Sequence, residues 1–282
     1  MRRLQLALLL LGIGLFFVVL QKVGFATVAK GLLVLGWTFP LILAVEFLID
    51  ALHTEGWRHC LPTTARTRVP RLDLLLVRTA GVGVNVLTPT ATVGGEVVKG
   101  MLLKRWIELG DGYASVMIDK LTFALGQTGF LLVGLGAVLQ VVPFSPRERI
   151  LSIVAAGLWL AGVAGFFILQ RRGIFRFGVG ALRAVFGGSG IFERLPEHAA
   201  DFDDRITRFL ATHHRDLVAS AGWHFVGQAA RTLQFYLALH ALGFEPSLET
   251  CLTAASGLVF MEATLFLIPG KVGVLEGGYV LV

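Results

Sequence analysis

The segment that most constrains the fold of this chain is residues 85–105, which places helix-breaking residues inside a strongly apolar sequence. Pro89 removes a backbone donor and breaks a helix, and the adjacent Gly94 and Gly95 loosen it further. The segment also carries charges, and each charge costs roughly 2.5–3.5 kcal/mol at the centre of a membrane on insertion scales. We therefore predict a membrane helix that enters, breaks near Pro89 and restarts at about Gly94.

A break of this kind is a candidate binding site. The restarted helix would present free N–H groups and the positive end of its dipole to an anion. Glu96 and Lys99 are three residues apart on one helical face, so they either neutralise each other or act on a ligand. In the second case Lys99, with Arg105 nearer the surface, attracts a lipid phosphate while Glu96 senses a proton or pairs with Lys99 at rest. Asn85 is either a helix-breaking hydrogen bonder or a ligand contact.

A second copy of the pattern lies near the end of the chain. Pro269 precedes Glu276 by seven residues, as Pro89 precedes Glu96, and Gly270 and Gly273 lie between them. Interrupted segments at corresponding points of two hydrophobic halves indicate the binding site of a transporter. The alternative is a pair of surface loops whose glutamates are solvated.

Composition places the chain among integral membrane proteins. Of its residues 55% are apolar and 16% are charged, against about 25% charged in a soluble domain. The net charge of +6 could indicate nucleic acid, but the basic residues lie in loops between apolar spans. That placement is typical of orientation signals and lipid headgroup contacts, and it predicts a cytoplasmic N-terminus. The two cysteines stand far apart, so neither a disulfide framework nor a metal site is predicted.

We predict an all-α, polytopic integral membrane helix bundle. Residues 50–71 and 171–215 are polar and basic, and we assign both to the cytoplasmic side, part of the second as an amphipathic surface helix. Leu72 to Leu87 is short and interrupted by Arg78, so we interpret it as the first limb of a re-entrant hairpin. The expected apolar elements are 4–20, 31–49, the hairpin limbs 72–87 and 90–103, then 113–142, 150–169, 217–242 and 248–268.

These elements form one transmembrane domain with two halves, about 1–142 and 143–282. The limb before Pro89 enters from the cytoplasm and the limb before Pro269 from outside, so the halves and their two broken helices form an inverted repeat. The first half continues past its glutamate with another limb and a further span. The sequence stops at Val282, within the corresponding limb of the second half, so we expect the natural chain to extend further.

Polar residues within the spans need partners. Asp119 and Lys120 are neighbours and point in different directions, and we expect Asp119 to bond the broken helix. His224, Gln228 and Arg231 form one stripe of the 217–242 span, and such a stripe faces the bundle or a cavity. We expect Arg231 to pair with an anion or to contact substrate, and the candidate anions are Glu262 and Glu46.

The pattern N-x3-P-x4-G-G-E-x2-K-x3-L-x-R, which runs from Asn85 to Arg105, resembles the lysylphosphatidylglycerol synthase transmembrane-region family. These proteins are also called flippase-like domain proteins, and one branch is associated with hopanoid biosynthesis. Asp119 and the late P-G-x2-G-x2-E fit the same family. The resemblance implies a bacterial inner-membrane protein that moves or presents lipids between leaflets. The chain has no soluble aminoacyl-transferase domain, so lipid lysinylation is not expected.

The sequence carries no enzyme signature, such as a phosphate loop or G-x-S-x-G, and we expect neither an enzyme nor a cofactor. Three hypotheses stay open. The first is a translocase for a phospholipid or a hopanoid- or polyprenyl-type lipid. The second is a non-catalytic membrane partner of lipid-biosynthesis enzymes. The third is a membrane-embedded transferase or a small-solute transporter. Membrane lipids are the expected partners in the first case, and nucleic acid is expected in none.

Overall fold

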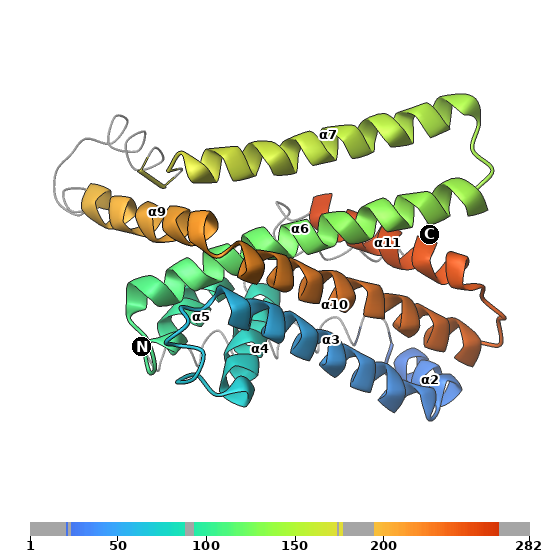
Figure 1. The fold of residues 1–282 in the computed structure, drawn as a ribbon. Helices are drawn as coiled ribbons and strands as arrows, with labels where there is room; N and C mark the ends of the chain where they lie inside the picture. The colour runs from blue at the N-terminus through green and yellow to red at the C-terminus, as the bar shows by residue number, and fades with distance from the viewer. Residues whose placement is uncertain (1–20, 22–23, 88–92, 174, 177–194, 265–282) are drawn as a thin grey trace.

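A computed structural model describes residues 21, 24–87, 93–173, 175–176 and 195–264. Within these residues the regular structure is helical throughout, which confirms the predicted all-α class (Figure 1). The described helices are α2 (Phe25–Leu35), α3 (Thr38–Cys60), α4 (Arg71–Leu87), α5 (Val93–Leu103), α6 (Leu109–Val141), α7 (Pro146–Arg171), α9 (Leu195–Thr212), α10 (His214–Ala241) and α11 (Leu248–Thr264).

Three long helices, α3, α6 and α10, run alongside one another and form the centre of the bundle (Figure 1). Helix α11 packs against α6 and α10, and the short helices α4 and α5 pack against each other, with α4 against α3 and α5 against α6. The main core draws Trp57 from α3, Leu121 from α6 and Ile206 from α9, each with its side chain fully enclosed. Leu74 of α4 and Leu103 of α5 belong to the same core, so the α4–α5 hairpin packs on it.

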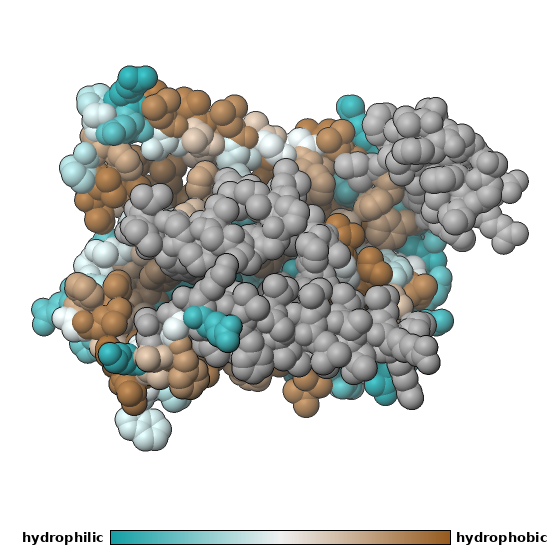
Figure 2. Space-filling model, turned by 180° about the vertical axis from the view of Figure 1, so that it is seen from behind, coloured by the Kyte–Doolittle hydropathy of each residue, from teal (hydrophilic) through white to brown (hydrophobic). Residues whose placement is uncertain are grey.

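The chain contains helices suited to crossing a membrane. Among the described residues α6 and α7 are long and apolar enough, and α2 with α3 qualifies as a third span if the bent pair is counted as one. Helix α7 buries none of its most apolar window in the protein, and Leu158 on it is 70% exposed. Figure 2 shows hydrophobic residues along the upper edge, where α7 runs. An apolar surface of this extent is typical of contact with lipid.

The predicted span 31–49 is wrong in its bounds. The helix breaks at Gly36, whose φ of 51° lies in the left-handed region that favours glycine, and the two pieces are bent by 87°. Helix α3 then continues to Cys60, well into the segment expected to be a loop. It continues because its polar side chains find partners on other helices: His53 contacts His224, and His59 contacts Asp216.

The connections before α7 and after α10 follow local signals. Ser145 caps α7 and forms a capping box with Glu148, with Pro146 at the first helical position. After α10, Gly243 adopts a φ of 85°, and the N–H groups of Gly243 and Phe244 donate to the carbonyls of His240 and Leu239. These signals leave residues 142–145 and 242–247 as connections, and α7 begins four residues before the predicted span 150–169.

Helix α9 is amphipathic, as the sequence predicts for part of 171–215, but its apolar face does not lie free for a membrane surface. Ile206, Phe209 and Leu210 are buried in the main core instead. On the polar side Arg205 donates hydrogen bonds to Asp111 and Glu108 at the start of α6. Helix α9 is therefore docked on the bundle by both of its faces.

The predicted hairpin is present as α4 and α5, and α5 begins at Val93, one residue before the expected restart. The two helices approach so closely that a Cβ on Gly95 would collide with the backbone oxygen of Gly81. Pro89 and the break itself lie outside the described residues. So do Pro269, Gly270, Gly273 and Glu276, and the inverted repeat therefore stays a prediction.

Gly95→Ala is expected to separate the two limbs and to lower the free energy of unfolding by about 1–3 kcal/mol, because backbone cannot yield as a flexible side chain can. Gly83→Ala is the matched control, since a Cβ there meets nothing within 4 Å. The control should be as stable as the wild type or slightly more so. Denaturant unfolding in detergent measures both, and equal stability of Gly95→Ala and wild type would contradict the close approach.

Candidate functional site

Glu96, in the first turn of α5, is the centre of a charged cluster. One carboxylate oxygen lies 3.1 Å from Lys99 Nζ, and the other lies 3.2 Å from Lys120 Nζ on α6. Asn85 on α4 also donates from Nδ2 to that second oxygen, at 3.3 Å. A carboxylate near a helix N-terminus is stabilised by the helix dipole. The cluster of Asn85, Glu96, Lys99 and Lys120 thus joins three helices.

Asn85 acts as a hydrogen bonder that closes the hairpin. Its Oδ1 accepts a hydrogen bond of 2.7 Å from the N–H of Gly95, in the first turn of α5. The N–H of Gly95 is therefore not free for an anion, because α4 supplies an acceptor in place of a ligand. Anion binding by the other N–H groups of this turn stays a prediction. Gly94 lies in the same turn, at the second residue of α5.

Lys99 is buried, with 6% of its side chain exposed, and it forms an ion pair with Glu96. Both alternatives allow this pair, so a direct role of Lys99 toward a ligand stays a prediction. Its ammonium also lies 5.9 Å from the centre of the Trp57 ring. Arg105 follows the end of α5 on the surface, where its guanidinium lies 5.1 Å from the ring centre of Trp106. Neither cation lines the cavity beside Glu96, and that position belongs to Lys120.

A cavity of ≈ 850 Å³ opens between α5, α6 and α9. Sites for small molecules occupy about 300–1,000 Å³, so this one is large. Its walls are mainly apolar, while Glu96 and Lys120 bring opposite charges into it. Lys120 is 39% exposed and is therefore within reach of a ligand. The described lining residues are Val93, Glu96, Val97, Glu108, Leu109, Gly110, Tyr113, Val116, Met117, Lys120, Phe175, Asp201 and Phe202.

Two further carboxylates at this cavity, Glu108 and Asp201, are held by Arg205. Desolvation opposes the charge of Arg205, but hydrogen bonds to Asp201, Asp111 and Glu108 outweigh it and raise the pKa of the guanidinium. Arg205 therefore keeps its charge and holds these acidic groups, so Lys120 is the cation available among the described lining residues.

The sequence predicts that Asp119 bonds the broken helix, but among the described residues its hydrogen bond goes to α10. Its Oδ1 lies 3.0 Å from Nε2 of His224 on α10, while its neighbour Lys120 turns to Glu96. Consecutive residues of a helix point about 100° apart, so one reaches α10 and the other the hairpin. His224 and Gln228 are buried, which confirms that their stripe faces the bundle.

Arg231 continues that stripe and donates from Nε to Oε1 of Gln228, at 3.2 Å. Glu46 accepts a hydrogen bond of 2.8 Å from Gln234 instead. Glu262 lies partly buried on α11. Pairing between Arg231 and Glu262 stays a prediction.

Two features of the interior were missed by sequence reasoning. His53 lies in the part of α3 that the sequence predicts as a loop, and its buried ring contacts His224. Arg78 was seen only as an interruption of α4, but it is buried with its Nε 3.5 Å from Asp50 Oδ1. For Arg78 the usable signal is a charge within an apolar run, which in a membrane protein indicates a buried partner. His53 carries no such signal, because the polar residues Asp50 and Thr54 lie close to it in the sequence.

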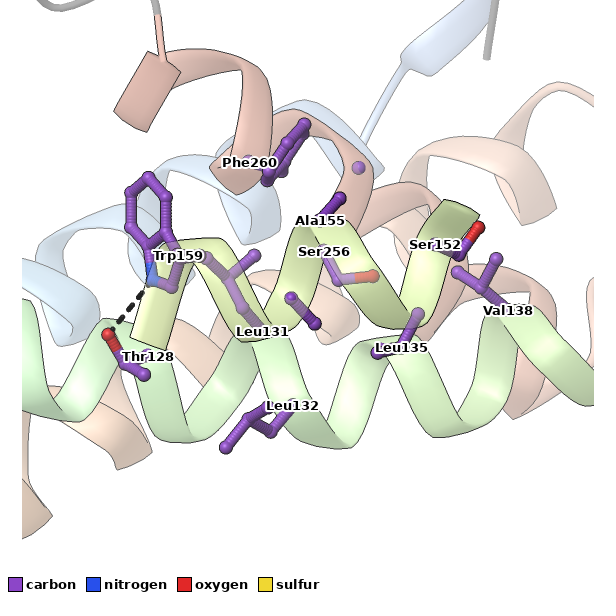
Figure 3. Close-up of a pocket in the computed structure, with 12 residues that line it drawn as sticks. Thr128, Leu131, Leu132, Leu135, Val138, Ser152, Ala155, Trp159, Ser256 and Phe260 are labelled. Carbon is purple, nitrogen blue, oxygen red and sulfur yellow. Dashed lines mark hydrogen bonds between the residues drawn. The ribbon is translucent and has the colours of Figure 1, made fainter. Parts of the chain in front are cut away.

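A second, smaller cavity of ≈ 250 Å³ lies between α6, α7 and α11. In Figure 3 its lining side chains are apolar apart from hydroxyl groups, and Trp159 donates from Nε1 to Thr128 Oγ1 at 3.1 Å. The described lining contains no charged residue. We therefore place the candidate site in the larger cavity, beside Glu96 and Lys120.

Comparison with known proteins identifies one family. The family model described as "Lysylphosphatidylglycerol synthase TM region" matches residues 4–282, which is nearly the whole chain. No curated protein and no solved structure matches the chain significantly.

Proposed function

The chain belongs to the family of the lysylphosphatidylglycerol synthase TM region, and we propose that it is a translocase that moves a phospholipid between membrane leaflets. The family supports a membrane protein of lipid metabolism or flippase type. We further propose a bacterial inner membrane, as the family resemblance implies, and an N-terminus in the cytoplasm, following the distribution of basic loops.

The observation that carries this proposal is the cavity between α5, α6 and α9. Its apolar walls suit acyl chains, and Lys120 supplies an accessible cation for a headgroup phosphate. An ammonium group binds a phosphate as a point charge and forms a charge-assisted hydrogen bond. Lys120 can turn from Glu96 to a phosphate because Lys99 continues to neutralise Glu96. The phosphate is the reason for choosing a phospholipid over a neutral lipid.

The α4–α5 hairpin favours translocation of a lipid rather than lipid binding at a site that does not move. An element of two short helices, closed by Asn85 and by the contact of Gly81 with Gly95, can move as a unit against α6. Such interrupted elements lie beside the substrate in transporters. In the proposed step the hairpin shifts, the phosphate leaves Lys120 and the lipid passes to the other leaflet.

Reconstitution into liposomes tests the proposal. We expect the wild type to exchange a fluorescent phospholipid between leaflets about tenfold or more faster than a glycolipid with the same chains and no phosphate, since a charge-assisted bond contributes about 1.5–3 kcal/mol. Leaflet exchange is measured by chemical bleaching of the outer leaflet. Liposomes with heat-inactivated protein give the background rate.

Two results would contradict translocation. Exchange at the background rate for both lipids would leave the chain as a membrane partner of lipid-biosynthesis enzymes. Formation of a modified lipid in detergent, where no leaflets exist, would indicate a transferase instead.

A further inference from the structure

A row of three hydrogen-bonded polar side chains crosses the centre of the bundle. None of the three lines the proposed lipid cavity. His53 on α3 and His224 on α10 lie with their Nδ1 atoms 2.9 Å apart. On its other side His224 Nε2 lies 3.0 Å from Asp119 Oδ1 on α6. All three residues are buried, and His53 is only 2% exposed.

The geometry fixes the direction of the hydrogen bonds when Asp119 is ionised. A carboxylate only accepts, so His224 Nε2 must donate to it. The neutral His224 ring then has a bare Nδ1, which accepts from the Nδ1–H of His53. The bare Nε2 of His53 then ends this row of hydrogen-bonded side chains. It is buried and has no hydrogen-bond partner among the described residues. An unpaired buried acceptor of this kind needs an explanation.

Neighbouring residues hold both rings in place. A Cβ on Gly56 would lie 2.8 Å from the His224 ring, and a Cβ on Gly227 would lie 2.7 Å from the His53 ring. Phe123 packs on both, with ring centres 5.1 Å from His53 and 5.2 Å from His224. The two histidines therefore have little room to turn away from each other.

Charged groups on the surrounding helices α4, α5 and α10 interact electrostatically with His53 or Asp119. Arg78 of α4, which pairs with Asp50 of α3, acts on both ends, and Arg231 of α10 acts on His53. Lys99 of α5 acts on Asp119. These cations stabilise an ionised Asp119 and repel a positive charge placed on His53. Burial opposes a charge on either His53 or Asp119, and passing the proton to Asp119 leaves all three side chains neutral.

We propose that His53, His224 and Asp119 form a proton-binding relay inside the bundle. A proton binds His53 Nε2, His53 passes its Nδ1 proton to His224 Nδ1, and His224 passes its Nε2 proton to Asp119 Oδ1. The net change is the uptake of one proton, after which both histidines are neutral rings and Asp119 is a neutral acid. The relay stands whether or not the protein moves lipids.

The test counts protons on the full chain in detergent, without any transport. After a downward pH jump, an indicator dye reports the protons bound per chain, and ¹⁵N NMR of labelled histidine follows the ring nitrogens. We expect the wild type to bind one proton more than Asp119→Asn and one more than His53→Gln. His53 Nε2 should change from a bare to a protonated nitrogen over the same pH range. His214→Gln, which removes an exposed histidine, is the matched control for the His53 ring signal.

The relay would be overturned if His53 Nε2 stayed unprotonated at every pH at which the protein is folded. Equal proton uptake by wild type and by a folded Asp119→Asn variant would overturn it as well. If that variant does not fold, the NMR titration of wild-type His53 decides alone. Failure of lipid exchange with intact proton uptake would count against the proposed function only.

Discussion

Replacing Glu96 with glutamine is expected to lower the free energy of unfolding by about 3–5 kcal/mol, because removing one partner of a buried ion pair leaves an uncompensated charge. Lys99 would stay buried beside Trp57 with no carboxylate at 3.1 Å. The acceptor oxygen that Asn85 and Lys120 share would also lose its charge. Denaturant unfolding of the purified protein in detergent measures this change.

The double variant Glu96→Gln with Lys99→Met is the control for this effect. Replacing a whole buried pair with groups that carry no charge is often neutral, so the double variant should recover most of the lost stability. A double variant as unstable as the single one would show that Glu96 acts through other contacts. Wild-type stability of Glu96→Gln alone would contradict the buried pair.

Lys120→Gln is expected to slow phospholipid exchange in liposomes about tenfold or more, since a hydrogen bond to a charged group contributes about 1.5–3 kcal/mol. The fold should survive, because Lys120 is 39% exposed and Glu96 keeps its pair with Lys99. The slow glycolipid exchange should not change, because that headgroup has no phosphate. The same bleaching assay measures both lipids in wild-type and variant liposomes.

Lys104→Gln is the matched control for charge, since Lys104 is exposed after α5 and does not line the cavity. It should exchange phospholipid at the wild-type rate. Equal loss in both variants would indicate a general surface-charge effect. An unchanged rate in Lys120→Gln would remove Lys120 from the site.

The α4–α5 hairpin could be predicted from the sequence because its signals are local. Proline and paired glycines interrupt one apolar run, and Glu96 and Lys99 share a helical face whatever the rest of the chain does. The start of α7 at Pro146 was not predicted, since the expected span began at 150. The polar stripe of His224 and Gln228 does follow from a local signal. Helical spacing alone places each of these groups.

The partners of buried polar groups could not be predicted, because they depend on which helices pack together. The sequence points Asp119 toward the hairpin, but the contact of α6 with α10 brings it to His224. His53 falls in a predicted loop because polar residues after Ile49 are typical of the end of a span. Only the packing of α3 on α10 shows that these polar residues continue the helix to Cys60.

The central claim is that the cavity beside Glu96 and Lys120 holds a phospholipid, and photocrosslinking tests it most directly. A photoreactive amino acid replaces Met117, which lines the cavity, or Leu158, which is exposed on α7. Liposomes contain phospholipid and glycolipid in equal amounts, and mass spectrometry identifies the captured lipid. We predict that position 117 captures several times more phospholipid than glycolipid, while position 158 captures both in bilayer proportion. The same proportion at both positions would contradict the claim.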